Sequence, residues 1–393
     1  MPIVNRVAAM HDDIKAWRHD LHAHPELLFD VHRTAWTVAE KLKAFGCDEV
    51  VTGIGRTGVV GVIRGSRAAP AAEASRKAIG LRADMDALPI EEASDLPYKS
   101  TVPGKMHACG HDGHSAMLLG AARYLAETRN FAGTAVVIFQ PAEEGGGGGR
   151  AMVQEGLMER FRIDEVYGMH NYPGLAVGQF AIRPGPQMAA ADRITIEIEG
   201  KGGHAARPHV SVDTVLVGAQ MVNQIQSIVA RNVDPLAAAV VSICTFQAGS
   251  TDNVIPQTAL LRGTARSLTP QVRDLLERRI GEVVEGTARL YGAKAKLTYK
   301  RDYPVTRNHE TQTMFAASVA AEVVGRDRVD TDVPPVMGAE DFSFMLEARP
   351  GAFIFVGNGE SAGLHHPAYD FNDEAIPIGT SYWVRLVETA LAA

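Results

Sequence analysis

Residues 78–89 have the sequence A-I-G-L-R-A-D-M-D-A-L-P, a short apolar run followed by two aspartates. Such a run, ending on polar residues, is typical of a buried strand. Similar runs occupy 59–63, 135–139 and 165–169, and residues 114–127 have a helical pattern. Buried strands that alternate with helices indicate an α/β sheet covered on both faces.

The flanking segments are predicted to belong to the same domain. Apolar residues at helical spacing predict helices over 4–21, 34–45 and 314–324, and 353–356 is predicted to be a further strand. The alanine-rich stretch 68–74 is expected to form a surface loop.

The region 192–301 has a different pattern. Its first segment, R-I-T-I-E-I-E at 193–199, alternates apolar with polar residues, as in a strand with one solvent-facing side. The elements predicted after it are a helix at 212–229, strands at 237–246 and 258–266, a helix at 270–290 and a strand at 294–300. The order βαββαβ is that of a ferredoxin-like split βαβ domain. We therefore expect a larger α/β domain in two parts, 1–187 and 302–393, with residues 188–301 inserted.

Composition excludes several classes of protein. The 393 residues are 46% hydrophobic and 22% charged, which is typical of a globular protein. Lys and Arg total 39 against 46 Asp and Glu, and no basic block is present, so nucleic acid is not an expected partner. No apolar run suits a membrane span and no export signal is visible. Three widely spaced cysteines, Cys47, Cys109 and Cys244, favour a reducing, cytoplasmic location.

Acidic residues and histidines follow the predicted strands. Asp84 and Asp86 come just after the strand at 78–81, Glu143 and Glu144 follow the one at 135–139, and His170 ends the one at 165–169. Ligands of open α/β sheets bind at the carboxyl ends of the strands, so these side chains are expected to converge. Cys109 and His111 lie just before the helix at 114–127, and His365 lies after the strand at 353–356.

A thiol, several imidazoles and carboxylates at one rim suit a borderline-soft cation, with zinc expected first and manganese, cobalt or nickel as alternatives. Five candidate ligands are present: Cys109, His111, Glu144, His170 and His365. Five ligands are too many for one tetrahedral ion that keeps a water, and they suit two divalent ions. A pair of ions roughly 3.5–4 Å apart can hold water and polarise a carbonyl, which predicts hydrolysis.

Glu143 and Glu144 are neighbours whose side chains point in different directions, so one is expected to bind metal and the other to act as general base. We assign Glu143 as the base, although the pattern alone does not say which glutamate is the ligand. His107 and His114 are either further ligands or supporting donors. Gly145–Gly149 allow a tight turn or keep the site open.

Seven motifs, in order, resemble the amidohydrolase branch of the glutamate-carboxypeptidase and aminoacylase metallopeptidase family. The motifs are R-A-D-M-D-A-L-P (82–89), M-H-A-C-G-H-D-G-H-S-A-M-L-L-G-A-A (106–122), F-Q-P-A-E-E-G-G-G-G (139–148), G-M-H-N (168–171), G-K-G-G-H-A-A-R-P-H (200–209), N-V-I-P (253–256) and G-L-H-H-P-A-Y-D-F-N-D (363–373). The resemblance covers essentially the whole chain. It implies a zinc-peptidase-like catalytic domain with a mixed sheet, and an inserted domain that serves as lid and dimerisation domain.

The resemblance also implies roles for individual residues. The implied metal ligands are Cys109, His111, Glu144, His170 and His365, with Glu143 as catalytic base and Asp86 as an orienting residue. Asp84 stands where related branches carry a metal-binding histidine. In the inserted domain His204 is implied to donate to the substrate carbonyl oxygen, in its own or a partner subunit's site. The residues implied to bind the substrate carboxylate are Asn253, Arg266 and Arg207, with surface ion pairing as the alternative for the two arginines.

The expected activity is metal-dependent hydrolysis of the amide of N-acyl amino acids, hippurate-like or N-acetylated, which releases a carboxylic acid and a free amino acid. A homodimer or homotetramer through the inserted domain is expected, with lid hinges near Gly185 and Arg301. Two alternatives remain: a metal-independent cysteine hydrolase that uses Cys109, and a binding protein without turnover on the same fold.

Overall fold

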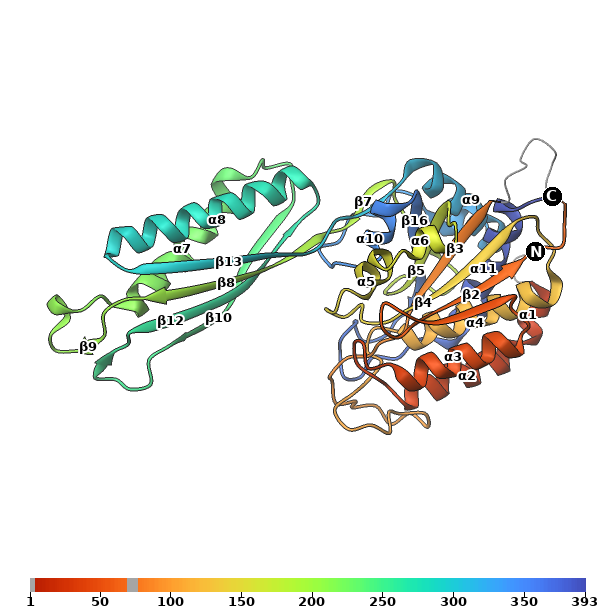
Figure 1. The fold of residues 1–393 in the computed structure, drawn as a ribbon, viewed down its shortest axis with the longest axis horizontal. Helices are drawn as coiled ribbons and strands as arrows, with labels where there is room; N and C mark the ends of the chain where they lie inside the picture. The colour runs from red at the N-terminus through yellow and green to blue at the C-terminus, as the bar shows by residue number, and fades with distance from the viewer. Residues whose placement is uncertain (1–3, 69–76) are drawn as a thin grey trace. The chain divides into compact units, whose positions relative to one another are not determined.

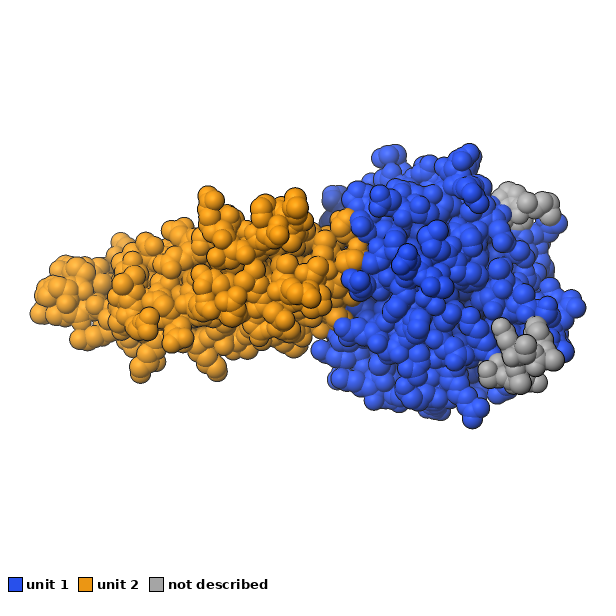
Figure 2. All heavy atoms as spheres, turned by 90° about the horizontal axis from the view of Figure 1, so that it is seen from above, with its two compact units in different colours: residues 1–185, 307–334, 341–393 blue, residues 186–306, 335–340 orange. Residues whose placement is uncertain are grey.

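The protein is described by a computed structural model that covers residues 4–68 and 77–393. The chain divides into two compact units (Figure 2): unit 1 is Met1–Gly185, Arg307–Pro334 and Asp341–Ala393, and unit 2 is Pro186–Thr306 and Pro335–Glu340. The expected insertion, 188–301, lies inside unit 2, which also takes in the unexpected segment 335–340. The loop expected at 68–74 lies, apart from Ala68, outside the described residues.

Unit 1 contains an eight-stranded mixed sheet in the order β1-β2-β4-β3-β5-β16-β6-β15. The strands are β1 (Glu49–Ile54), β2 (Gly58–Arg64), β3 (Ala78–Asp84), β4 (Thr134–Gln140), β5 (Glu165–Pro173), β6 (Phe180–Ala181), β15 (Val329–Asp330) and β16 (Gly351–Gly359). The four central strands β4, β3, β5 and β16 run parallel, whereas β1, β2 and β6 pair antiparallel. The predicted α/β class with a mixed sheet is confirmed.

Helices complete unit 1 (Figure 1). They are α1 (Asn5–Ala9), α2 (His11–Ala23), α3 (His32–Ala44), α4 (His111–Thr128), α5 (Gly148–Gln154), α6 (Leu157–Arg160), α9 (Glu310–Val324), α10 (Ser343–Ala348) and α11 (Ile376–Ala390), with 3-10 turns at Arg326–Arg328 and Asp373–Ala375. The apolar helix α4 is buried along nearly its whole length and packs against α2, α11 and β3.

The alternation of side chains along the central strands decides which residues reach the site. Ile79, Leu81 and Ala83 of β3 enter the main hydrophobic core. Because successive strand residues point to opposite faces, Arg82 and Asp84 lie on the other face. Asp84 pairs in register with Gln140 of β4, so the polar ends of both strands lie side by side.

Unit 2 contains a four-stranded antiparallel sheet in the order β10-β12-β8-β13. Its elements are β8 (Ala190–Glu199), β9 (Gly203–His204), a 3-10 turn at Pro208–Val210, α7 (Thr214–Asn232), β10 (Ala239–Ala248), β11 (Val254–Ile255), β12 (Thr258–Ser267), α8 (Pro270–Tyr291) and β13 (Lys294–Tyr303). The main elements follow the order βαββαβ, and Ile194, Ile196 and Ile198 of β8 point into the core. Short strands β7 (Gly185–Met188) and β14 (Thr306–Asn308) lie where the chain passes between units.

Several expectations about single elements were wrong. The helix expected over 4–21 is two helices, because the backbone at Met10 departs from helical geometry and α2 starts afresh with Asp12 and Asp13 in its first turn. The patterns also missed β1 and α11. Among the described residues no helix is long and apolar enough to cross a membrane.

Candidate metal and active site

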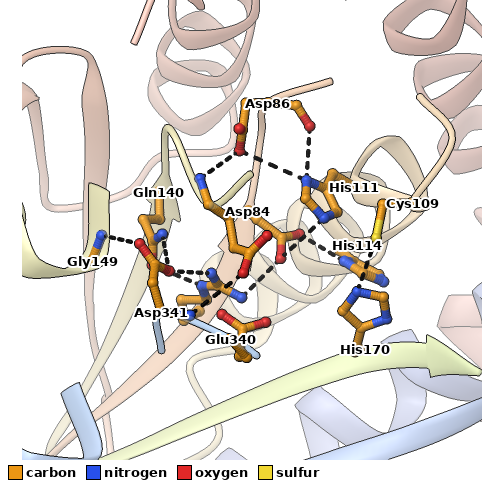
Figure 3. Close-up of polar contacts among 12 residues, drawn as sticks. Asp84, Asp86, Cys109, His111, His114, Gln140, Gly149, His170, Glu340 and Asp341 are labelled. Atoms are coloured by element: carbon orange, nitrogen blue, oxygen red, sulfur yellow. Dashed lines mark hydrogen bonds and ion pairs between the residues drawn. The ribbon is translucent and has the colours of Figure 1, made fainter. Parts of the chain in front are cut away.

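Five side chains of unit 1 meet near the ends of β3, β4 and β5. Figure 3 shows three of them, Cys109, His111 and His170. Among the described residues, five groups of side chains have ligand atoms that all lie within 4.8 Å of one another. Two of these groups hold the expected ligands: Cys109 with His111 and His170, and Cys109 with Glu144 and His365. The structure therefore brings together all five expected ligands. Cys109 belongs to both groups, so its Sγ lies within 4.8 Å of a ligand atom of each of the other four candidates.

The segment of Cys109 and His111 is shaped by the glycine between them. Gly110 has φ of 89°, a conformation that favours glycine. A Cβ at this position would lie 2.3 Å from Asn171 Oδ1 and 2.7 Å from Tyr369 Oη. The close packing fixes the direction in which the thiol and the imidazole on either side leave the backbone.

His170 lies within a strand rather than at its end. Strand β5 continues through Pro173, so the expected end at Met169 was wrong. The strand continues because β16 pairs with it over this length, with Phe355 opposite His170. His365 follows β16 in a loop, has φ of 65°, and donates its backbone N–H to Ala108 O at 2.7 Å. This hydrogen bond ties the last ligand segment to the first.

Asp86 holds the two glutamates. Its Oδ1 accepts from the backbone N–H of Glu143 at 2.8 Å, and its Oδ2 accepts from that of Glu144 at 3.1 Å. The residue before them, Ala142, has φ of 55°, so the chain turns sharply after β4. This geometry supports the orienting role expected for Asp86.

Hydrogen bonds set the tautomers of two histidines. His111 Nδ1 donates to the backbone O of Asp86 at 2.7 Å, and His170 Nδ1 donates to the backbone O of Asn171 at 2.7 Å. Each ring therefore keeps the lone pair of Nε2 for another partner, the arrangement typical of metal-ligating histidines. His170 Nε2 lies 3.4 Å from Cys109 Sγ.

Two buried atoms show that the donor set fits a cation. Neither His111 Nε2 nor Glu144 Oε1 has a hydrogen-bond partner among the residues that the structure describes, although both are buried. They lie 3.9 Å apart, and Glu144 Oε1 lies 3.3 Å from His365 Nε2. Buried polar atoms without partners are costly, and a bound cation would satisfy both atoms.

The electrostatics of the cluster also favour positive charge. Burial raises the pKa of the Cys109 thiol well above its usual value, and the carboxylates of Glu144, Glu143 and Asp84 raise it further. Burial acts in the opposite direction on His111, but Asp84, Asp86 and Glu144 outweigh it and raise the pKa of this imidazole to about 10. Both shifts indicate an excess of buried negative charge.

Asp84 and His114 support each other. Asp84 Oδ2 accepts from Arg82 Nη1 at 2.8 Å, and Asp84 Oδ1 lies 2.6 Å from His114 Nδ1. Burial alone would raise the pKa of Asp84, but the charges of His111, Arg82 and His114 lower it well below its usual value. His114 Nε2 lies 2.7 Å from Asn171 Oδ1, so both of its ring nitrogens are engaged.

His107 lies outside the candidate metal groups of the described residues. Its ring is buried with no hydrogen-bond partner for either nitrogen among these residues, and burial lowers its pKa to about 3.

The expected substrate-binding residues of unit 2 fall in two places. His204 of β9 pairs with Val254 of β11, and the backbone N–H of Ala205 donates to Asn253 O at 3.1 Å, so His204 and Asn253 are neighbours. The backbone N–H of Arg207 donates to His204 O at 2.8 Å. These three residues lie at the end of the sheet where β12 begins.

Arg266 lies near the other end of β12. It lies eight positions after Thr258, roughly 26 Å along a strand. The guanidinium is half-buried and has no hydrogen bond or ion pair with any described residue. The surface ion pair considered for this arginine is therefore not formed.

Three residues near Glu143 were missed by the sequence patterns. Arg82, Gln140 and Asp341 are fully buried and hydrogen-bonded to one another. An arginine inside an otherwise apolar strand was the available signal for Arg82, since buried charges are normally paired.

Comparisons with known proteins identify the family of the chain. The sequence profile of "Peptidase family M20/M25/M40" matches residues 80–389. The hippurate hydrolase of Campylobacter jejuni is 41% identical over 98% of this chain and 98% of its own, and the N-acetylcysteine deacetylase of Bacillus subtilis is 38% identical over 98% of each. A Bacillus subtilis structure described as a dinuclear metal-binding peptidase of the M20 family has a TM-score of 0.83 at 34% identity, covering 98% of this chain and 99% of that one. The chain belongs to the peptidase family M20/M25/M40.

Proposed function

We propose that the protein is a metal-dependent amidohydrolase that cleaves the amide of N-acyl amino acids into a carboxylic acid and a free amino acid. The observation that carries the proposal is the pair of ligand groups that share Cys109, together with the buried atoms His111 Nε2 and Glu144 Oε1, which make no hydrogen bond with any described residue. Full-length relatives at about 40% identity, a hippurate hydrolase and an N-acetylcysteine deacetylase, support the substrate class.

The proposed cofactor is two divalent cations per chain, held by Cys109, His111, Glu144, His170 and His365. Zinc is proposed first because thiolate and imidazole are its preferred donors, with manganese, cobalt and nickel as alternatives. When bound, the cations would polarise the amide carbonyl and lower the pKa of the attacking water.

Glu143 is proposed to act as general base and then as general acid. Its backbone is fixed by Asp86, and its carboxylate is buried beside the ligand groups. Glu143 takes a proton from the attacking water as the C–O bond forms, and gives it to the amine nitrogen as the C–N bond breaks.

His204 is proposed to donate a hydrogen bond to the carbonyl oxygen. Its Nδ1 accepts from the backbone N–H of Ala206 at 3.1 Å, so the ring proton of neutral His204 is on Nε2. Asn253, Arg207 and Arg266 are proposed to bind the carboxylate of the substrate. The guanidinium of Arg266, which has no ion pair with any described residue, supports this role.

The test combines metal analysis with a substrate panel. The purified protein is expected to contain about two transition-metal ions per chain and to release free amino acid from hippurate or N-acetyl amino acids. Glu143→Gln should keep the metal and lose roughly 10²- to 10⁴-fold in kcat, the usual contribution of a general base. Glu360→Gln, the same change at an exposed position, is the matched control. Full turnover in Glu143→Gln, or turnover that survives complete metal removal, would disprove the scheme.

We further propose a homodimer through unit 2. Strand β10 is an edge of the four-stranded sheet, and its ten residues, A-V-V-S-I-C-T-F-Q-A, carry no charge. Cys244 lies on this strand and is exposed. Val215 and Leu216 of α7 are also exposed. A long uncharged edge beside exposed apolar side chains favours pairing with a second copy.

The separation of His204 from Arg266 supports a site shared between two subunits, because roughly 26 Å along β12 is more than one small substrate can span. Mixing Glu143→Gln with His204→Ala chains tests this. If His204 acts in the partner's site, each mixed dimer regains one intact site, and random mixing restores about a quarter of wild-type activity. No restoration would place His204 in its own subunit's site.

A reducing, cytoplasmic location is also proposed. Cys47, Cys109 and Cys244 are all free thiols, as expected in a compartment where disulfides do not persist. Cell fractionation would test it.

A further inference from the structure

Asp341 is a further buried carboxylate close to Glu143, and its side chain accepts several hydrogen bonds. Its Oδ1 accepts from Gln140 Nε2 at 2.6 Å and from Arg82 Nη2 at 3.1 Å, and its Oδ2 accepts from the backbone N–H of Gly149 at 2.8 Å. Arg82 Nε donates to Gln140 Oε1 at 2.9 Å. Asp341, Gln140 and Arg82 are fully buried, so each side chain is fixed by the others.

This network reaches the candidate base. The backbone N–H of Asp341 donates to Glu143 Oε1 at 3.4 Å. Hydrogen bonds at catalytic groups are often long before the substrate binds and shorten in the complex. A hydrogen bond to one carboxylate oxygen restricts the rotation of the group and so limits the directions in which the second oxygen can point.

The glycine run that follows Glu144 fits the same network. A Cβ on Gly149 would lie 2.7 Å from Asp341 O and 3.1 Å from Gln140 Oε1. A Cβ on Gly148 would lie 1.7 Å from Pro141 O. Larger residues would therefore push the backbone away from Asp341, which gives these glycines a packing role.

We propose that Asp341 is a positioning residue for Glu143: its carboxylate, locked by Arg82, Gln140 and Gly149, holds its own backbone N–H against Glu143 Oε1. Asp341 is the first residue of unit 1 after the segment 335–340, so its side chain also fixes where the chain re-enters the unit. The inference rests on the proposed role of Glu143 as base.

The test is a double-mutant cycle with hippurate as the probe. Asp341→Asn, which places an amide among the three donors, is expected to lower kcat about 10- to 100-fold, the effect of displacing a catalytic group by about 1 Å. KM should stay within about two-fold and metal content should not change, because Asp341 is not among the proposed ligands. Asp341→Asn added to Glu143→Gln should cause no further loss, because the residue acts only through Glu143.

Gln140→Met is the second variant, in case Asp341→Asn does not fold. It removes one donor to Asp341 and makes no contact with Glu143 in the described network, so a smaller loss of kcat is expected, again absent with Glu143→Gln. Asp373→Asn is the matched control: Asp373 pairs with the buried Arg18 of the same unit at 3.4 Å, and activity should be unchanged.

Three results decide the inference. Unchanged kcat in folded Asp341→Asn would overturn it. A loss of equal size with and without Glu143→Gln would also overturn it, because the effect would then be a general structural one. Full turnover in Glu143→Gln alone would instead overturn the proposed function, which makes the two failures distinguishable.

Discussion

Asp86→Asn is the most informative single substitution at the site. The carboxylate accepts two successive backbone N–H groups, from Glu143 at 2.8 Å and Glu144 at 3.1 Å. Asparagine keeps one acceptor oxygen and turns an NH₂ group toward the other N–H. A hydrogen bond to a charged group contributes about 1.5–3 kcal/mol, and the retained bond becomes a neutral one. We therefore expect the free energy of unfolding to fall by roughly 2–4 kcal/mol.

The same change should affect function through both glutamates. Displacing Glu144 is expected to weaken metal binding about 10- to 100-fold, as is typical when a residue supporting a ligand is lost. Displacing Glu143 by about 1 Å is expected to lower kcat up to about 100-fold at saturating metal. Metal affinity would be measured by competition with a chelator, stability by urea unfolding, and kcat with hippurate.

Glu26→Gln provides the matched control. Its carboxylate also accepts two successive backbone N–H groups, from Arg33 at 3.1 Å and Thr34 at 2.8 Å, at the start of α3. This variant should lose comparable stability while metal affinity stays unchanged. If Asp86→Asn keeps wild-type metal affinity and kcat, or if both variants lose metal equally, the orienting role assigned to Asp86 is refuted.

Other perturbations follow from the same contacts. Gly110→Ala should lower the free energy of unfolding by about 2–4 kcal/mol in urea. A φ of 89° costs alanine about 1–2 kcal/mol, and the new Cβ overlaps Asn171 Oδ1. Unchanged stability would show that the loop adapts. Dialysis against a chelator should abolish hydrolysis and lower Tm, because His111 Nε2 loses its proposed metal partner. Added zinc should restore activity and Tm. A metal-free protein with unchanged Tm would contradict the proposed metal site. His22 should stabilise the fold at neutral pH: burial lowers its pKa, but Asp112 and other acidic partners raise it to about 9. The folded pKa of His22 lies above the unfolded value of about 6.5, so its stabilising contribution is complete below pH 6.5. This contribution, up to about 3 kcal/mol, is lost as the pH rises through about 9. The stability difference between wild type and His22→Gln should therefore shrink from pH 6.5 to 10, and a constant difference would exclude this linkage.

The sequence by itself determined the fold class, the main elements and the set of metal-ligand candidates. Periodicity was sufficient because strands such as β3 and β4 are buried on both faces, and β8 alternates as a half-buried strand does. Residue types were sufficient to predict the ligand candidates, because a thiol, imidazoles and carboxylates that gather at strand ends seldom serve a purpose other than metal binding. A break such as that at Met10 leaves the helical spacing of the flanking residues nearly intact, so the pattern could not reveal it.

Only the tertiary structure decided how these residues are used. Cys109 belongs to both ligand groups because its Sγ lies within reach of side chains from three distant segments, a property of packing that no local pattern contains. Likewise Asp341 lies beside Arg82 although 259 positions separate them, and their contact depends on how the segment after residue 340 packs against β3. Local sequence sets the backbone preference and the functional groups that are available. Long-range packing sets the distances between those groups, the tautomers of the histidines and the partners of the buried charges.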